Sequence, residues 1–513
     1  MADSAYLAPL GSPAMGGVSA GLVAGALAGL ALPPLGLPPL LWLALVPLWS
    51  FAAAEGGQRR PAIGAAAIWG GLAVLVSHRW LLALHPLDWI GVPMALSLPL
   101  CWLLLLFCAA AGALLVATWV ALAQRLNGAR PSTALLLSGL WGLVEVALAK
   151  GPLFWIGLGG AALPGDRALA GLASWGGAGL LAAVQLAIGW CLWQLWRAGP
   201  GGRRKWASIS ALVVLVAHGL GAWALAAIPL VGSATEEVLV VQPAIPTRQK
   251  FQAAEQALLD RRLALGLEEG RRLGVVAVLL PEGAMGVDPL LAEPAPVQLI
   301  SGGFRWQERG RQWEQRSSLL RFEPGESRAG AALDKHRLVP LGEWVPLGGL
   351  LRWSGLSAVG GLEPGEPSRL LPRPQGAIGA AICYELSDGS ALAAATREGA
   401  RWLLVSANLD PYPPLLQAQF EALAQLRAIE TGRALVSVAN TGPSGLINAR
   451  GLVVTRLPVN GAATSLLKVP QLSALTPYDR WGEMPLLALT LLAGLWRVNR
   501  TGVARGDRPR GEP

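Results

Sequence analysis

Apolar runs long enough to cross a lipid bilayer fill most of the first 230 residues. A spanning helix needs about 20 apolar residues, and we predict spans near residues 15–32, 37–54, 62–78, 90–123, 132–149, 168–196 and 206–230. An eighth, shorter run lies at 481–498. The mean hydropathy is +0.47 and only 14% of residues are charged, against about 25% in soluble proteins. We therefore expect a multi-pass α-helical membrane domain with about eight spans.

The distribution of Lys and Arg predicts the orientation of these spans. If the N-terminus is cytoplasmic, the segments on that side hold 13 basic residues, whereas the opposite short loops hold 3, namely Arg79, Lys150 and Arg167. Because basic residues concentrate on the cytoplasmic side, both termini are predicted to be cytoplasmic. Residues 1–230 then form the membrane domain and 231–480 an extracytoplasmic domain. Residues 481–498 form the last span, and 499–513 a basic, disordered cytoplasmic tail.

The charge and the metal-ligand residue types exclude several classes of function. The net charge is +9, but residues 231–480 carry 25 Lys and Arg against 24 Asp and Glu. The soluble part therefore has no excess of the kind that nucleic-acid binding requires, and we expect no nucleic-acid partner. Four cysteines and four histidines show neither a disulfide framework nor metal-ligand spacing. We expect no cofactor, no metal and no obligate protein partner.

Residues 231–480 alternate short apolar segments with amphipathic ones. Strands are predicted at 237–242, 275–280, 297–302, 317–322, 377–382, 402–406, 434–439, 445–448 and 453–457. Helical spacing of apolar residues covers 251–269 and 415–431. Strand–helix alternation predicts an α/β domain with a layered sheet core.

Three reactive side chains follow predicted strands, where open α/β sheets place their chemistry. They are Glu282 in LLPEGAMG, Lys335 in LDKHRLVPLGEWVPL and Cys383 in GAAICYEL. A thiol becomes a nucleophile only when it loses its proton. A carboxylate such as Glu282 can accept that proton, and an ammonium such as Lys335 can stabilise an oxyanion. Taken singly, each residue is more often structural, and their conjunction carries the prediction.

The order Glu, Lys, Cys within these strings resembles the nitrilase superfamily, whose triad sits on an α-β-β-α sandwich. The string KHRLVPLGEWVPL and the membrane scaffold narrow the resemblance to the apolipoprotein N-acyltransferases of the bacterial inner membrane. The resemblance covers nearly the whole chain. It implies a nitrilase-like domain on the periplasmic side of that membrane.

The resemblance also implies roles for six residues. Glu282 would be the general base, Lys335 the charge stabiliser and Cys383 the nucleophile. Glu343 would be a second essential glutamate, and Tyr384 and Glu385 would shape the pocket. His336 should point away from Lys335 if the segment is extended. The chain departs from the family pattern at Leu280 and in SANLDPYPP at 406–414.

The implied reaction has two steps. Cys383 takes an acyl chain from a membrane phospholipid as a thioester, and the N-terminal amine of a diacylglyceryl apolipoprotein then takes that chain. The loops that carry Trp80, Trp89 and Trp155 suit an interfacial aromatic belt, and 348–365, with Trp353, suits either a lid or a plain surface loop. Two alternatives remain open, a membrane-tethered nitrilase-type amidohydrolase and a catalytically degenerate scaffold. A transporter fits less well, because only Glu145 places a charge clearly within a span.

Overall fold

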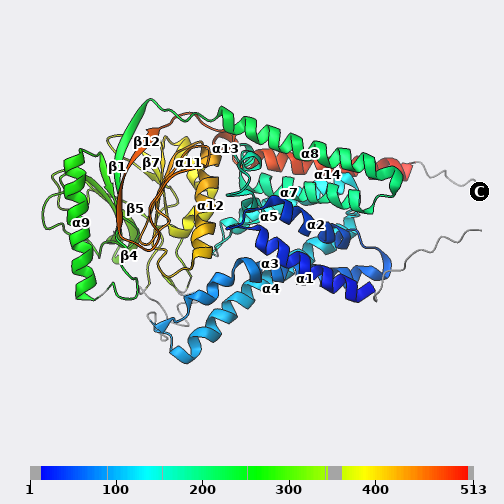
Figure 1. Cartoon of the computed structure of the whole chain (residues 1–513), viewed down its shortest axis with the longest axis horizontal. Helices are drawn as coiled ribbons and strands as arrows, with labels where there is room; N and C mark the ends of the chain where they lie inside the picture. Colours follow the sequence, from blue (N-terminus) through cyan, green and yellow to red (C-terminus); the bar gives the residue numbers. More distant parts are fainter. Residues whose placement is uncertain are drawn as a thin grey trace, which may run out of the picture.

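The protein is described here from a computed structural model that covers residues 13–88, 91–152, 154–250, 252–340, 342–344 and 361–506. Apolar helices gather on one side of the molecule and two β-sheets on the other (Figure 1). Predicted features at Trp89 and at 345–360, including Trp353, lie outside the described residues.

Helices occupy every apolar run that the sequence predicted as a span. They are α1 (Pro13–Ala31), α2 (Pro38–Ala52), α3 (Arg59–Ser77), α4 (Met94–Leu126), α5 (Pro131–Ala149), α7 (Ala173–Arg197), α8 (Pro200–Ala227) and α14 (Met484–Gly506). Five segments of the described part are long and apolar enough to cross a membrane, namely Gly56–Ser77, Met94–Leu126, Pro131–Ala149, Ala173–Arg197 and Pro200–Ala227. Gly17–Ala31, Pro38–Ala52 and Met484–Asn499 are apolar but shorter.

Two of these helices differ from the predicted runs. The run at 168–196 is divided into a short α6 (Arg167–Ala170) and α7, and α7 itself breaks at Gly176 and Gly177. Gly177 has a φ of +68° and its missing Cβ leaves room for the ring of Tyr478, so a tertiary contact determines the break. Helix α14 runs to Gly506 rather than ending at 498, so part of the predicted disordered tail is helical.

The soluble part contains two six-stranded sheets. The first has the order β12-β1-β2-β3-β4-β5 and the second β11-β10-β9-β8-β7-β6. Their bounds are β1 (Ala234–Gln242), β2 (Ala277–Leu279), β3 (Gln298–Arg309), β4 (Gln312–Phe322), β5 (Ala331–Asp334), β6 (Leu370–Leu371), β7 (Ile378–Ile382), β8 (Leu403–Ala407), β9 (Leu435–Ala439), β10 (Gly445–Ile447), β11 (Val453–Arg456) and β12 (Ala463–Gln471). The central strands β1–β2–β3 and β7–β8–β9 are parallel and apolar, as buried α/β sheets require.

Helices cover the outer faces of the two sheets. Helix α9 (Ala253–Leu273) packs on the first sheet, and α11 (Gly389–Arg397) and α12 (Pro414–Thr431) pack on the second. The result is the predicted α-β-β-α sandwich, with α11 and α12 facing the membrane helices and α9 farthest from them (Figure 1). The residues that pack between the sheets form one core, because alternate side chains of both sheets point inward.

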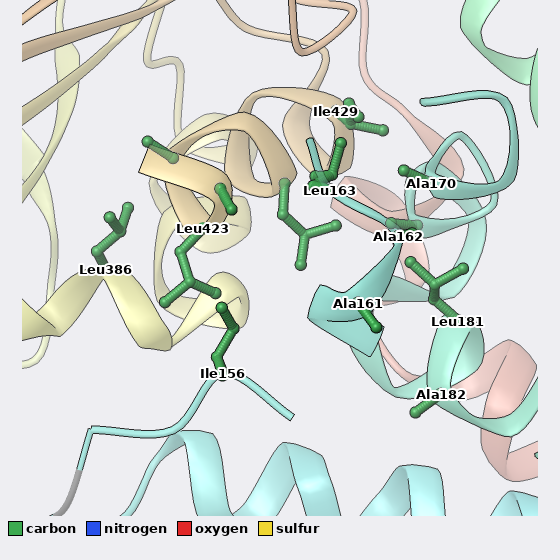
Figure 2. Packing of buried hydrophobic residues seen from close by; sticks show 14 of the residues in the cluster. Ile156, Ala161, Ala162, Leu163, Ala170, Leu181, Ala182, Leu386, Leu423 and Ile429 are labelled. Carbon is green, nitrogen blue, oxygen red and sulfur yellow. The ribbon is translucent and has the colours of Figure 1, made fainter. Parts of the chain in front are cut away.

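The same hydrophobic core continues from the sandwich into the membrane helices. Ile156, Ala161 and Leu181 on one side pack near Leu386 and Leu423 on the other (Figure 2). Polar contacts reinforce the junction: Glu430 Oε1 accepts from the backbone N–H of Ala178 at 2.9 Å, and Gln419 Nε2 donates to the carbonyl of Ser77 at 2.9 Å. The sandwich is thus fixed on the helices rather than tethered by a linker.

Candidate active site

Cys383 lies in a tight turn immediately after β7. The turn is a 3-10 helix (Cys383–Ser387), and Cys383 itself has a φ of +54°. This region is unfavourable for an L-residue by roughly 1–2 kcal/mol, so the surrounding packing must hold the turn. The thiol-bearing residue is buried, with 8% of its surface exposed. The buried parallel strand β7 is therefore followed directly by the residue that carries the thiol.

Lys335 directly follows β5 and is almost fully buried, with 1% of its surface exposed. Its backbone N–H donates to the carbonyl of Ser317 at 2.8 Å, which prolongs the pairing of β5 with β4. Its Nζ lies 2.7 Å from Glu282 Oε1 and 2.7 Å from Glu343 Oε1. One ammonium thus joins two carboxylates that lie far apart in the sequence.

Glu282 lies three residues after the end of β2 at Leu279. Its Oε1 accepts from Lys335, and its Oε2 accepts from the backbone N–H of Asn408 at 3.1 Å. Gly302 on β3 passes so close that a Cβ there would collide with the Cα of Glu282 and the carbonyl of Pro281. A glycine at this position lets the Glu282 turn sit against the sheet.

Burial and neighbouring charge determine the protonation states of the cluster. Burial alone would lower the pKa of Lys335, but the charges of Glu282 and Glu343 outweigh it and raise this pKa well above its ordinary value. Burial raises the pKa of Glu343, partly opposed by Lys335. Lys335 therefore stays a cation over the physiological range and can serve as a fixed positive charge.

The Cys383 thiol is neutral at rest. Burial raises its pKa well above the ordinary value, and the charge of Glu282 raises it further, whereas Lys335 and the backbone N–H of Tyr384 lower it. A neutral thiol needs a base at the moment of attack. Glu282 is a carboxylate near that thiol and has the chemistry to be that base.

Glu385 connects the turn that carries Cys383 to the loop that carries Lys335. Its Oε1 accepts from the backbone N–H groups of His336 and Arg337 at 2.7 and 3.1 Å, and its Oε2 accepts from that of Ile382 at 2.9 Å. Arg369 neutralises it, and Arg369 also donates to the carbonyl of Asp334 at 2.9 Å. Glu385, with 3% of its surface exposed, holds the loops that carry Lys335 and Cys383 at a fixed separation.

Tyr384 also joins these loops. Its hydroxyl donates to the carbonyl of Leu338 at 2.8 Å, and the Arg337 guanidinium lies 4.8 Å from its ring centroid. Burial raises the pKa of Tyr384 to about 12, so its hydroxyl remains a donor. His336 is exposed, whereas its neighbour Lys335 is buried.

Sequence reasoning missed several residues around the cluster. Tyr412, from the SANLDPYPP string, lies close enough to Cys383 and Glu282 for their charges to raise its pKa, although burial is the larger cause. Its ring contacts Trp80 of the membrane part, with centroids 5.8 Å apart. Trp80 is buried rather than a member of an exposed interfacial belt. Arg369 was also missed, because it lies in no recognisable sequence motif.

The cluster contains no arrangement of metal ligands. Within the described ranges, no group of three or more His, Cys, Asp or Glu side chains is placed to hold a metal ion. The reactive groups in the cluster are a buried thiol, two carboxylates and one ammonium. Such a set can form and break an acyl–sulfur bond by nucleophilic attack with general base assistance.

Two family models match this chain in separate ranges. An apolipoprotein N-acyltransferase N-terminal domain matches residues 24–191, and a carbon-nitrogen hydrolase domain matches 310–477. The second range contains Lys335, Glu343 and Cys383, and Glu282 precedes it. Among solved structures, yeast Nit3 of the nitrilase superfamily is similar over 47% of this chain and 92% of its own, with a TM-score of 0.36 and 16% identity.

Curated relatives match nearly the full length. An apolipoprotein N-acyltransferase of Prochlorococcus marinus (strain MIT 9313) is 50% identical over 480 residues, which are 90% of this chain and 93% of the relative. An apolipoprotein N-acyltransferase of Parasynechococcus marenigrum (strain WH8102) is 50% identical over 422 residues, 81% of this chain and 88% of the relative. This chain belongs to the apolipoprotein N-acyltransferase family.

Proposed function

We propose that this protein transfers an acyl chain from a membrane phospholipid to the N-terminal amine of a diacylglyceryl apolipoprotein. The observation that carries the proposal is the Lys335 ammonium, 2.7 Å from both Glu282 and Glu343, beside the buried Cys383 thiol. The names of the relatives supply the acceptor class. The fixed junction with apolar helices supports a lipid donor, because it holds the thiol close to helices that suit a bilayer.

In the first half-reaction, Cys383 Sγ attacks the ester carbonyl carbon of the phospholipid while Glu282 takes the thiol proton. The developing oxyanion is stabilised by the Lys335 charge, which stays positive because of the carboxylates around it. Collapse breaks the ester C–O bond, and Glu282 returns the proton to the leaving alcohol. The products are a thioester on Cys383 and a lysophospholipid.

In the second half-reaction, the neutral α-amine of the apolipoprotein attacks the thioester carbonyl carbon. Glu282 takes a proton from the attacking nitrogen, and Lys335 again stabilises the oxyanion. The C–S bond breaks, and the departing sulfur of Cys383 regains the proton from Glu282. The product is an amide, so the acyl chain ends on nitrogen and the enzyme returns to its resting state.

We also propose the orientation in which the sandwich lies on the periplasmic side of the inner membrane and both termini lie in the cytoplasm. The support is the asymmetry of Lys and Arg between alternate loops. Arg272→Cys on α9 and Arg203→Cys on α8 test it in intact cells with a membrane-impermeant maleimide. Labelling of the first position alone is expected, and labelling of the second alone would overturn the orientation.

Intact mass spectrometry tests the reaction. Full-length protein and its Cys383→Ala variant are incubated with phosphatidylethanolamine of one chain length in nanodiscs. We expect the wild type, and not the variant, to gain the mass of one acyl chain and to lose it when a diacylglyceryl-cysteine peptide is added, with the peptide gaining that mass. Discharge by water without peptide acylation would indicate a membrane-tethered amidohydrolase. The absence of any adduct would indicate a degenerate domain or a different acyl donor, and the same measurement with other phospholipids separates these two.

A further inference from the structure

The C-terminal end of the membrane helix α5 accepts hydrogen bonds from the loop that carries Lys335 and from the turn that carries Cys383. Helix α5 ends at Ala149, whose carbonyl accepts from Ser387 Oγ at 2.9 Å. Two residues further, the carbonyl of Gly151 accepts from Arg337 Nη2. The last carbonyls of a helix have no partner within it, and here the sandwich supplies the donors.

Arg337 and Ser387 also bind each other. Arg337 Nη1 donates to Ser387 Oγ at 2.9 Å, and Ser387 is buried, with 1% of its surface exposed. Arg337 is two residues from Lys335, and Ser387 is four residues from Cys383. The pair therefore joins three elements at one point: the lysine loop, the cysteine turn and the membrane helix.

The position of Arg337 is electrostatically favourable on both sides. A cation at a helix C-terminus is stabilised by the partial negative charge of its carbonyls. The Arg337 guanidinium also lies over the ring of Tyr384, the residue after the nucleophile, at 4.8 Å. A movement of α5 would thus be transmitted through Arg337 to the loop that carries Lys335 and to the turn that carries Cys383.

Among the described residues, the other polar contacts across the junction do not involve the loop of Lys335 or the turn of Cys383. Glu430 and Gln419 belong to α12, and Arg450 donates to the carbonyl of Ile228 at 2.9 Å. These contacts attach the sandwich to the helices as a whole. The contacts of Arg337 and Ser387 instead reach the segments that carry the reacting groups.

We propose that Arg337 is a positioning residue that, with Ser387, fixes the Cys383 thiol and the Lys335 ammonium relative to the membrane helices, at the height where a bilayer-anchored donor presents its ester. The inference rests on the proposed function. Arg337 Nη1 donates to Ser387 Oγ, and Arg337 Nη2 donates to the carbonyl of Gly151. The Arg337 guanidinium therefore uses these hydrogen bonds to hold the lysine loop, the cysteine turn and α5 together, and it does not bind the phosphate of the donor.

The test is single-turnover acylation of Cys383 by phosphatidylethanolamine in nanodiscs, followed by intact mass spectrometry over a range of donor concentrations. The variants are Arg337→Gln, Arg337→Lys, Ser387→Ala and the double variant Arg337→Gln/Ser387→Ala. Arg272→Gln is the matched control, because Arg272 is an exposed arginine on α9, far from the membrane helices. Melting temperatures are measured in the same nanodiscs.

We expect Arg337→Gln to reduce the saturating acylation rate by about tenfold to a hundredfold, because small displacements of a reacting group have effects of this size. The donor concentration for half-maximal rate should stay unchanged, and Arg337→Lys should recover part of the rate. The double variant should be no slower than Arg337→Gln, because the two residues act as one unit. The control should match the wild type.

Several results would overturn the inference. A rise in the half-saturating donor concentration at an unchanged maximal rate would make Arg337 a donor-binding residue. Additive losses in the double variant would separate the two residues, and a rate loss that only follows a lowered melting temperature would make the contact merely structural. If the wild type forms no adduct, the proposed function fails as well, whereas a normal wild type with an unaffected Arg337→Gln defeats this inference alone.

Discussion

Arg369 Nη1 donates hydrogen bonds to both carboxylate oxygens of Glu385, each 2.9 Å long. Both residues are 3% exposed, so the pair is buried. The same carboxylate accepts hydrogen bonds from the backbone N–H groups of His336, next to Lys335, and Ile382, next to Cys383. This single ion pair therefore connects the loop that carries Lys335 to the turn that carries Cys383.

We predict that Glu385→Gln destabilises the protein by about 3–5 kcal/mol, the usual result of leaving one partner of a buried ion pair uncompensated. The amide oxygen of Gln can replace only one carboxylate oxygen, and the amide nitrogen cannot accept the backbone hydrogen bonds that the other oxygen accepts. Acyl-enzyme formation should also fall sharply, because the loop of Lys335 and the turn of Cys383 lose their shared anchor. Thermal unfolding and intact mass spectrometry measure the two effects.

Glu268→Gln is the control for this prediction. Glu268 pairs with Arg271 on the exposed face of α9, and exposed pairs contribute little. This variant should leave both the melting temperature and acylation unchanged. Equal losses in the two variants would mean that the Glu385 pair has no special role.

The high pKa of Cys383 predicts how its alkylation by iodoacetamide depends on pH. Only the thiolate reacts, and burial raises the pKa of this thiol well above its ordinary value. Below that pKa the thiolate fraction, and hence the rate, should rise about tenfold per pH unit from pH 7 to 9 without a plateau. Mass spectrometry of the labelled peptide follows the rate, and a plateau below pH 8 would contradict the neutral resting thiol.

Glu282→Gln should change thiol reactivity and acyl transfer in opposite directions. The charge of Glu282 raises the pKa of Cys383 and that of Lys335 lowers it. Removing the first charge lowers this pKa, so alkylation at pH 7.5 should be faster than in the wild type. Acyl transfer should be slower by about a hundredfold or more, because no base moves the protons between the thiol, the leaving alcohol and the amine. Slower alkylation together with slower transfer would indicate a collapsed site instead.

The architecture could be predicted from the sequence because its signals are periodic or local. Apolar runs predicted the positions of α1 to α5, and alternation of short apolar segments predicted the central strands. The strands that the sequence analysis missed are β5, β6 and β12, which are short or alternate with exposed residues. Edge strands of this kind are determined by their sheet partners rather than by their own composition.

Within the site, the side chains that we expect to react could be recognised from the sequence, whereas the residues that hold them in place could not. Cys383 follows a strand that the sequence predicts, so its position and its chemistry both point to it. Lys335 was recognised from its side chain and the string around it, because β5, the strand before it, was not predicted. Arg369 and Arg337 are ordinary arginines in irregular segments, and their importance arises from partners 16 and 50 residues away. Only the folded chain brings those partners together.

Gly302→Ala provides a test of how the base is positioned. A Cβ at Gly302 would meet the Cα of Glu282 and the carbonyl of Pro281, which are backbone atoms and cannot rotate away. We expect a loss of about 1–3 kcal/mol of stability, typical of overpacking, together with slower acylation because Glu282 moves relative to Lys335. Gly461→Ala is the control, since no atom lies within 4 Å of its added Cβ. Acylation kinetics and thermal unfolding should distinguish the two variants, because Gly461→Ala should change neither the acylation rate nor the stability. Normal acylation in Gly302→Ala would show that the Glu282 carboxylate tolerates displacement.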